Sequence, residues 1–148
     1  MSMLEQAIAL ATAAHSGEVD KAGAPYILHP LRVMLAMQSD KQRIVAVLHD
    51  VVEDCGVSLK WLRQMGFSKK VVRAVDALTR REDEKDDYEA FVRRAARNRT
   101  ARAVKLADLR DNLDISRIPH PTAADRMRCL KYERAVALIR SLERNPTV

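Results

Sequence analysis

Apolar side chains recur every three or four residues along most of the chain, and strictly alternating stretches are hard to find. This period is typical of amphipathic α-helices and not of half-buried β-strands. The pattern predicts helices at about residues 3–15, 30–38, 41–53, 58–65, 68–78, 87–97, 100–112 and 122–144. No internal repeat or low-complexity linker divides the pattern, so we expect one all-α domain of about eight helices over residues 1–148.

The expected breaks between these helices coincide with residues that cap or end helices. SGEVDKAGAPYILHP (16–30) is expected to form a loop, because it contains Gly17, Gly23 and Pro25, and Pro30 at its end suits the first position of a helix. The other expected boundary residues are Asp40, Ser58 and Ser68 as N-caps, Gly66 as a helix end, and the prolines of IPHPT (118–122) as an interruption.

Two charged segments are expected to face solvent. RREDEKDD (80–87) reads as an exposed connection between helices. VRRAARNRTARAVK (92–105) holds five arginines and predicts two helices joined by a turn, with a basic side in water. A role for these arginines in binding phosphates is the second interpretation.

The composition fits a soluble helical protein. Apolar residues make up 47% of the 148 residues and charged residues 31%, with 4% aromatic residues and four glycines. The formal charge of +6 favours a polyanionic partner such as a nucleotide. A nucleic-acid partner is not expected, because acidic residues are interspersed with the basic ones and stacking aromatics are few.

The two cysteines indicate a reducing, cytoplasmic location. Cys55 and Cys129 show neither a disulfide framework nor the CxxC spacing of a thiolate metal site. No apolar run is long enough to span a membrane, so no membrane partner is expected. The sequence does not indicate an oligomeric state.

The stretch AVLHDVVEDCG (46–56) places one imidazole and three carboxylates inside an apolar segment. In a continuous helix, His49 would stack on Glu53 and Asp50 on Asp54, because residues four apart share a face. Burying three carboxylates together is costly unless a cation balances them. This cluster therefore points to a metal ion or basic partners, with a solvated helix face as the alternative.

Two further residues qualify as ligands of the same ion. His29 precedes a predicted helix, and Asp108 lies in the otherwise apolar segment AVKLADLRDNL (103–113). With His49 and Asp50 they offer two nitrogen and two oxygen ligands. That mixed set suits a divalent transition ion such as manganese, iron, cobalt or zinc, with positions left for water or substrate.

The order of these motifs resembles the HD phosphohydrolase superfamily. The segments AHSGEVDKAGAPYILHPLRV, LHDVVEDCGVS and VKLADLRDN are most similar to the hydrolase domain of the RelA/SpoT family, which removes the 3′-pyrophosphate of guanosine tetra- and pentaphosphate. The resemblance runs from about Leu4 to Asn112, and its nearest likeness is to the small stand-alone hydrolases.

The resemblance implies a role for each matching residue. The metal ligands would be His29, His49, Asp50 and Asp108, usually for Mn²⁺. Glu53 and Asp54 would orient a water molecule and take up its proton. Lys21 and Asn112 would contact the nucleotide, and His15 would be structural.

The chain departs from the family pattern where the base is held. Asp20-Lys21 stands where the family usually has Arg-Lys, and that Arg lies against guanine. Leu109 replaces an Arg, and Arg110 and Asp111 stand where an apolar residue and a His are common. The pattern therefore favours metal-assisted phosphohydrolysis more strongly than it favours a guanine substrate.

Three other functions remain open from the sequence. The chain could be a different HD-type enzyme, a nucleotidase or a phosphatase acting on the 2′-phosphate of NADPH. It could be a nucleotide-binding regulatory module with weakened catalysis, although the Glu53-Asp54 pair argues against that. A basic helical nucleic-acid binder would explain the charge but not the clustered acids.

Overall fold

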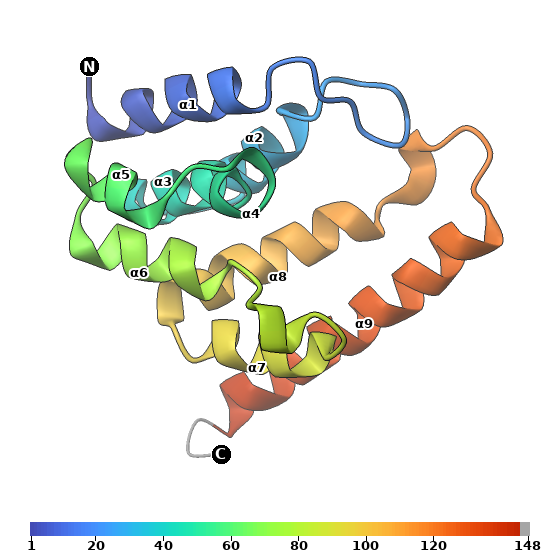
Figure 1. The fold of residues 1–148 in the computed structure, drawn as a ribbon. Coiled ribbons are helices and arrows are strands. Elements are labelled where there is room, and N and C mark those ends of the chain that lie inside the picture. Colours follow the sequence, from blue (N-terminus) through green and yellow to red (C-terminus); the bar gives the residue numbers. More distant parts are fainter. Residues whose placement is uncertain (146–148) are drawn as a thin grey trace.

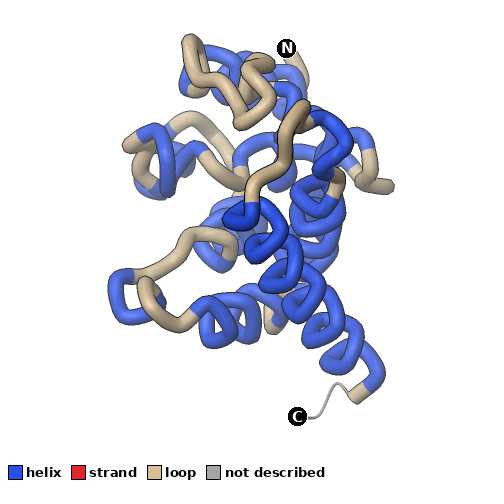
Figure 2. Tube along the Cα trace, turned by 90° about the vertical axis from the view of Figure 1, so that its right-hand side faces the viewer, coloured by secondary structure: helices blue, strands red, loops and turns tan. Residues whose placement is uncertain are grey.

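The computed structural model describes residues 1–145, and their fold is all-α, as the sequence predicts (Figure 1). The helices are α1 (Met3–Ala14), α2 (Leu28–Leu35), α3 (Asp40–Leu48), α4 (Val51–Cys55), α5 (Leu59–Gln64), α6 (Lys69–Ala77), α7 (Tyr88–Ala96), α8 (Arg99–Leu113) and α9 (Ala123–Arg144). Two short 3₁₀ helices, η1 (Glu82–Glu84) and η2 (Ile115–Arg117), lie in the connections. Over the described range Figure 2 shows helices and loops without a strand.

The predicted helix over 41–53 is wrong in one respect, since the chain breaks at His49 and Asp50 and forms α3 and α4. The Nδ1–H of His49 donates to the carbonyl of Ala46 at 2.5 Å. In an uninterrupted α-helix that carbonyl would accept from the amide of Asp50. The side chain of His49 therefore occupies the carbonyl that the next turn of the helix would need. Side-chain donors close in sequence can compete with the backbone in this way.

Other predicted boundaries shift by one to three residues. α2 begins at Leu28, so Pro30 is its third residue instead of its first. Ser39, and not Asp40, caps α3, with Gln42 completing a capping box. Ser58 and Ser68 cap α5 and α6 as expected.

Helix α8 runs between α2 and α3 on one side and α7 and α9 on the other (Figure 1), and it contributes to two apolar cores. Its Ala101 and Val104 belong to the larger core, which α1, α2, α3 and α6 also build. Its Leu106 and Leu109 belong to a smaller core shared with α7 and α9. Leu109 is fully buried there beside Ile139, so the apolar residue at this position serves the packing of α9.

No helix within residues 1–145 combines the length and hydropathy needed to cross a bilayer.

The segment over 80–87 is not wholly exposed, which corrects the prediction for it. Glu84 is 7% exposed, and it accepts from the guanidinium of Arg94 at 2.6 and 2.8 Å. Arg94 also donates to the carbonyl of Thr79 at 2.7 Å. One of the five arginines expected in water thus fastens the 80–87 connection to α7.

Replacing Glu84 by Gln is expected to lower the free energy of unfolding by about 1–3 kcal/mol at pH 7, because Arg94 loses a charged, buried partner. The hydrogen bonds from Arg94 hold the pKa of Glu84 at about 2, below its ordinary 4.5. A lowered carboxyl pKa stabilises the fold above pH 4.5, and this contribution is lost as pH falls toward about 2.

Urea unfolding at pH 7 and pH 3 measures the difference, with the exposed Glu82→Gln on the same 3₁₀ helix as the matched control. A difference between wild type and Glu84→Gln that is as large at pH 3 as at pH 7 contradicts the ion-pair account.

Candidate functional site

The four proposed metal ligands meet at one place in the fold. His29 comes from the first turn of α2, His49 and Asp50 from the break between α3 and α4, and Asp108 from the middle of α8. The Nε2 atom of His29 lies 2.9 Å from Oδ1 of Asp108, and the Nε2 atom of His49 lies 3.1 Å from Oδ2 of Asp50. Ligand atoms of His29, His49 and Asp50 all lie within 4.8 Å of one another.

His49 presents a bare nitrogen to this cluster. Its Nδ1–H is used by the Ala46 carbonyl, so Nε2 carries the lone pair in the neutral ring. Nε2 is buried and has no hydrogen-bond partner among the described residues. A buried nitrogen lone pair without a donor is the arrangement that a metal ion satisfies.

Each carboxylate is held by further hydrogen bonds. The hydroxyl of Tyr26 donates to Oδ2 of Asp50 at 2.5 Å. Oδ2 of Asp108 accepts from the ammonium of Lys105 at 3.0 Å, and its Oδ1 accepts from the amide of Asn112 at 3.2 Å. Lys105 is itself buried, with its ammonium near the rings of Tyr88 and Phe91.

The electrostatics of the cluster favour positive charge at its centre. Burial alone would lower the pKa of His49, yet the nearby carboxylates of Asp50 and Asp108 raise it well above the usual value. Burial likewise lowers the pKa of His29, but hydrogen bonds to Asp108 and Asp111 raise it overall. Burial alone would raise the pKa of Asp108, but Lys105 and the imidazoles keep it well below the ordinary range.

These residues fit a divalent cation. Two imidazole nitrogens and two carboxylates, one imidazole already without a hydrogen-bond partner, form a donor set typical of Mn²⁺, Fe²⁺, Co²⁺ or Zn²⁺. A cation there would also replace the proton that each imidazole otherwise binds.

Glu53 and Asp54 lie on α4, one turn past the break, and both are exposed. The expectation that all three carboxylates sit in apolar surroundings is therefore wrong for this pair, because α4 is short and turns them toward solvent. Partial burial and the charge of the neighbouring carboxylates still raise the pKa of each. Arg80 lies 3.5 Å from Glu53 and is a residue that the sequence patterns did not identify.

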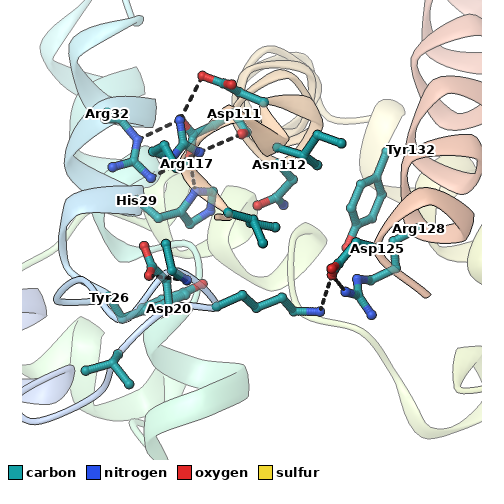
Figure 3. Close-up of a pocket in the computed structure, with 16 residues that line it drawn as sticks. Asp20, Tyr26, His29, Arg32, Asp111, Asn112, Arg117, Asp125, Arg128 and Tyr132 are labelled. Atoms are coloured by element: carbon teal, nitrogen blue, oxygen red, sulfur yellow. Dashed lines mark hydrogen bonds and ion pairs between the residues drawn. The ribbon is translucent and has the colours of Figure 1, made fainter. Parts of the chain in front are cut away.

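A cavity of about 370 Å³ opens beside the proposed ligands. In Figure 3, His29, Arg32 and Asp111 line one side, and Asp125, Arg128 and Tyr132 of α9 line the other. The predicted nucleotide contacts Lys21 and Asn112 both border this space, whereas Glu53 and Asp54 are not among its lining residues. Volumes of this size accommodate small-molecule ligands.

The presence of Asp20, one of the departures from the family pattern, is explained by the loop in which it lies at the edge of the cavity. Oδ1 of Asp20 accepts from the backbone amides of Ala22 and Ala24, each at 2.9 Å. Asp20 is therefore committed to shaping the turn before Tyr26. Lys21 points across the cavity, with its ammonium 4.0 Å from Oδ1 of Asp125.

Several residues at the site were missed by the sequence analysis. Tyr26 gave no signal because it lies in an irregular loop, and Arg128 and Tyr132 lie on α9, beyond the segment that resembles the family. Lys105 could have been found, since it lies three residues before Asp108 on the same helix. His15 lies apart from the ligand cluster, 3.4 Å from the sulfur of Cys55 and 3.2 Å from Glu18.

The chain is similar to known proteins over most of its described length. A family model described as HD domain matches residues 7–144. A guanosine-3′,5′-bis(diphosphate) 3′-pyrophosphohydrolase of Vibrio cholerae is 30% identical over 123 residues, which is 74% of this chain and 17% of that protein. The bifunctional (p)ppGpp synthase/hydrolase SpoT of Escherichia coli is 28% identical over the same shares. The chain thus covers only 17% of the length of each of these relatives.

A solved structure described as a metazoan ortholog of SpoT that hydrolyzes ppGpp has the same fold. Its TM-score is 0.80 at 22% identity, covering 94% of this chain and 85% of that one.

Loss of the unpartnered His49 nitrogen is expected to abolish divalent-ion binding. Saturating Mn²⁺ at 100 times the dissociation constant should raise the free energy of unfolding of the wild type by about 2.7 kcal/mol, and that of His49→Gln by none. Thermal or urea unfolding with and without Mn²⁺ measures this. The exposed His120→Gln is the control and should respond like the wild type; a normal Mn²⁺ response in His49→Gln rules out the ligand set.

Proposed function

Because this chain belongs to the HD domain family, we propose that it is a metal-dependent phosphohydrolase of nucleotides, with guanosine-3′,5′-bis(diphosphate) 3′-pyrophosphohydrolase activity. The single observation that carries the proposal is the placement of a buried His49 nitrogen without a partner, the half-buried Asp50, the buried Asp108 and His29 beside a cavity bordered by basic and acidic side chains. The names of the bacterial relatives support the choice of substrate.

In this proposal His29, His49, Asp50 and Asp108 hold a divalent ion, with Mn²⁺ as the physiological metal. Such an ion, when bound, acidifies water and offsets charge on phosphoryl oxygens. The chain's own residues then orient the reactants. Tyr26 and Lys105 fix the two ligand carboxylates through the hydrogen bonds described above.

Glu53 and Asp54 are the proposed water-orienting acids. Their raised pKa values make each carboxylate a better proton acceptor than an ordinary Asp or Glu. Water attacks phosphorus at the 3′ position and the acid pair takes the proton that water loses. The bond between the 3′-oxygen and the pyrophosphoryl group breaks, and the departing 3′-oxygen takes up that proton to become a hydroxyl. The products are pyrophosphate and GDP or GTP.

Cationic side chains favour a substrate with several phosphates. Lys21, Arg32 and Arg128 border the cavity. Burial, and then the charges of Arg80, Lys105 and Arg128, lower the pKa of Lys131, which lies on the same helix as Arg128. Grouped cations of this kind stabilise phosphoryl charge in a transition state. A cytoplasmic nucleotide is the substrate that we propose, and no nucleic-acid or membrane partner is invoked.

Asp20 favours one alternative. An aspartate tied into the loop by two amide hydrogen bonds cannot lie against a base as an arginine does. An HD-type nucleotidase or a phosphatase for the 2′-phosphate of NADPH is therefore the second candidate. A weakened nucleotide-binding module is disfavoured, because Glu53 and Asp54 are both present with raised pKa values.

Incubation of the Mn²⁺-loaded protein with guanosine 3′,5′-bis(diphosphate) should release pyrophosphate and GDP in equal amounts, and a metal-stripped sample should release neither. Chromatography that separates pyrophosphate from inorganic phosphate gives the readout. Survival of the substrate, together with phosphate release from NADPH or a nucleoside monophosphate, would replace this substrate by the alternative.

Glu53→Gln and Asp54→Asn should each lower turnover at least 100-fold, since general-base catalysis contributes about 10²–10⁴. Mn²⁺ binding should survive in both variants, because neither residue is a proposed ligand. The exposed Glu133→Gln on α9 controls for the loss of one carboxylate. Loss of metal together with activity would move these acids from the catalytic role to the ligand set.

A further inference from the structure

Asp111 lies on α8 and contacts the side of the His29 ring that faces away from Asp108. We propose that Asp111 is a positioning residue that fixes the tautomer and orientation of His29, so that Nε2 faces the metal. This inference rests on the proposed metal centre, and it assigns Asp111 a role that neither the ligand set nor the acid pair includes.

The ring of His29 is held between two carboxylates on opposite sides. Its Nδ1 lies 2.6 Å from Oδ2 of Asp111, and its Nε2 lies 2.9 Å from Oδ1 of Asp108. A carboxylate at Asp111 can only accept, so Nδ1 carries the hydrogen in that bond. The lone pair of the neutral ring is then on Nε2, the atom that faces Asp108 and Asp50.

The carboxylate of Asp111 is itself fixed. Its side chain is 12% exposed, and the guanidinium of Arg32 donates to its two oxygens at 2.7 and 3.0 Å. The guanidinium of Arg117, a residue of η2, lies 3.5 Å from Oδ2 of the same Asp111 carboxylate (Figure 3). A side chain that is this constrained can in turn constrain the ring it contacts.

The two proposed histidine ligands are thereby held in different ways. His49 donates its Nδ1–H to a neutral backbone carbonyl, whereas His29 donates to an anion. An anionic acceptor makes the opposite ring nitrogen a stronger donor to a cation. His29 is accordingly the more electron-rich ligand, and Asp111 is the cause.

The competing account is purely structural, because Asp111 also joins α2 to α8 through Arg32. Two variants separate the accounts. Asp111→Asn removes the charge next to His29 as well as the ion pair with Arg32. Arg32→Gln removes the same ion pair but leaves the carboxylate on His29. Asp114→Asn removes a carboxylate that also contacts Arg117 but does not contact His29, and is the matched control.

Affinity is measured with Mn²⁺ alone, by titrating the metal-stripped full chain and following free Mn²⁺ by electron paramagnetic resonance. Removal of an outer carboxylate of this type costs about 10–100-fold in metal affinity, so Asp111→Asn should bind Mn²⁺ at least 10-fold more weakly. Asp114→Asn should match the wild type, and Arg32→Gln should lose clearly less than Asp111→Asn. Should Asp111→Asn not fold, Asp111→Ser supplies a second neutral replacement.

A proton spectrum gives an independent readout. In the Zn²⁺-loaded wild type, the hydrogen-bonded Nδ1–H groups of His29 and His49 should give downfield signals. Asp111→Asn should lose or shift the His29 signal and keep that of His49, which is the internal reference. An unchanged His29 signal, or equal losses of affinity in Asp111→Asn and Arg32→Gln, overturns the inference. Absence of Mn²⁺ binding by the wild type would instead overturn the metal centre and the inference with it.

Discussion

The ion pair between Lys105 and Asp108 is the interaction on which the site depends. Both groups are buried, and a carboxylate taken out of water without a partner would cost several kcal/mol or lose its charge. Lys105 keeps Asp108 ionised in the middle of α8, between two apolar cores. The Asp108 carboxylate also contacts Nε2 of His29 and accepts a hydrogen bond from the side-chain amide of Asn112. One buried charge thus brings α2, α8 and the break after α3 to a common point.

Much of this organisation could be predicted from residue patterns. The helical period located the α-helices of residues 1–145, except that it joined α3 and α4 into one, and the expected ligand set does converge in space. The break at His49 could not be predicted from the spacing of apolar residues, because it arises from a hydrogen bond between the His49 imidazole and a backbone carbonyl. The burial of Glu84 escaped for a similar reason. Its segment is strongly charged, and only the tertiary position of Arg94 gives it a partner.

Contacts in the folded chain explain the departures from the family pattern. Leu109 fills the core against α9, and Asp20 shapes a turn through two amides. Asp111 places an anion against Nδ1 of His29. These explanations depend on contacts between residues far apart in the chain. His29 and Asp111, for example, are separated by 82 positions, so local motifs cannot indicate their contact.

The walls of the cavity have a different origin in the chain from the proposed ligands. The ligands fall between residues 29 and 108, whereas Asp125, Arg128 and Tyr132 come from the last helix (Figure 3). Removal of α9 would therefore keep every proposed ligand in the chain but take away one wall of the cavity, together with Ala135 and Ile139, which pack with Leu109 in the smaller core.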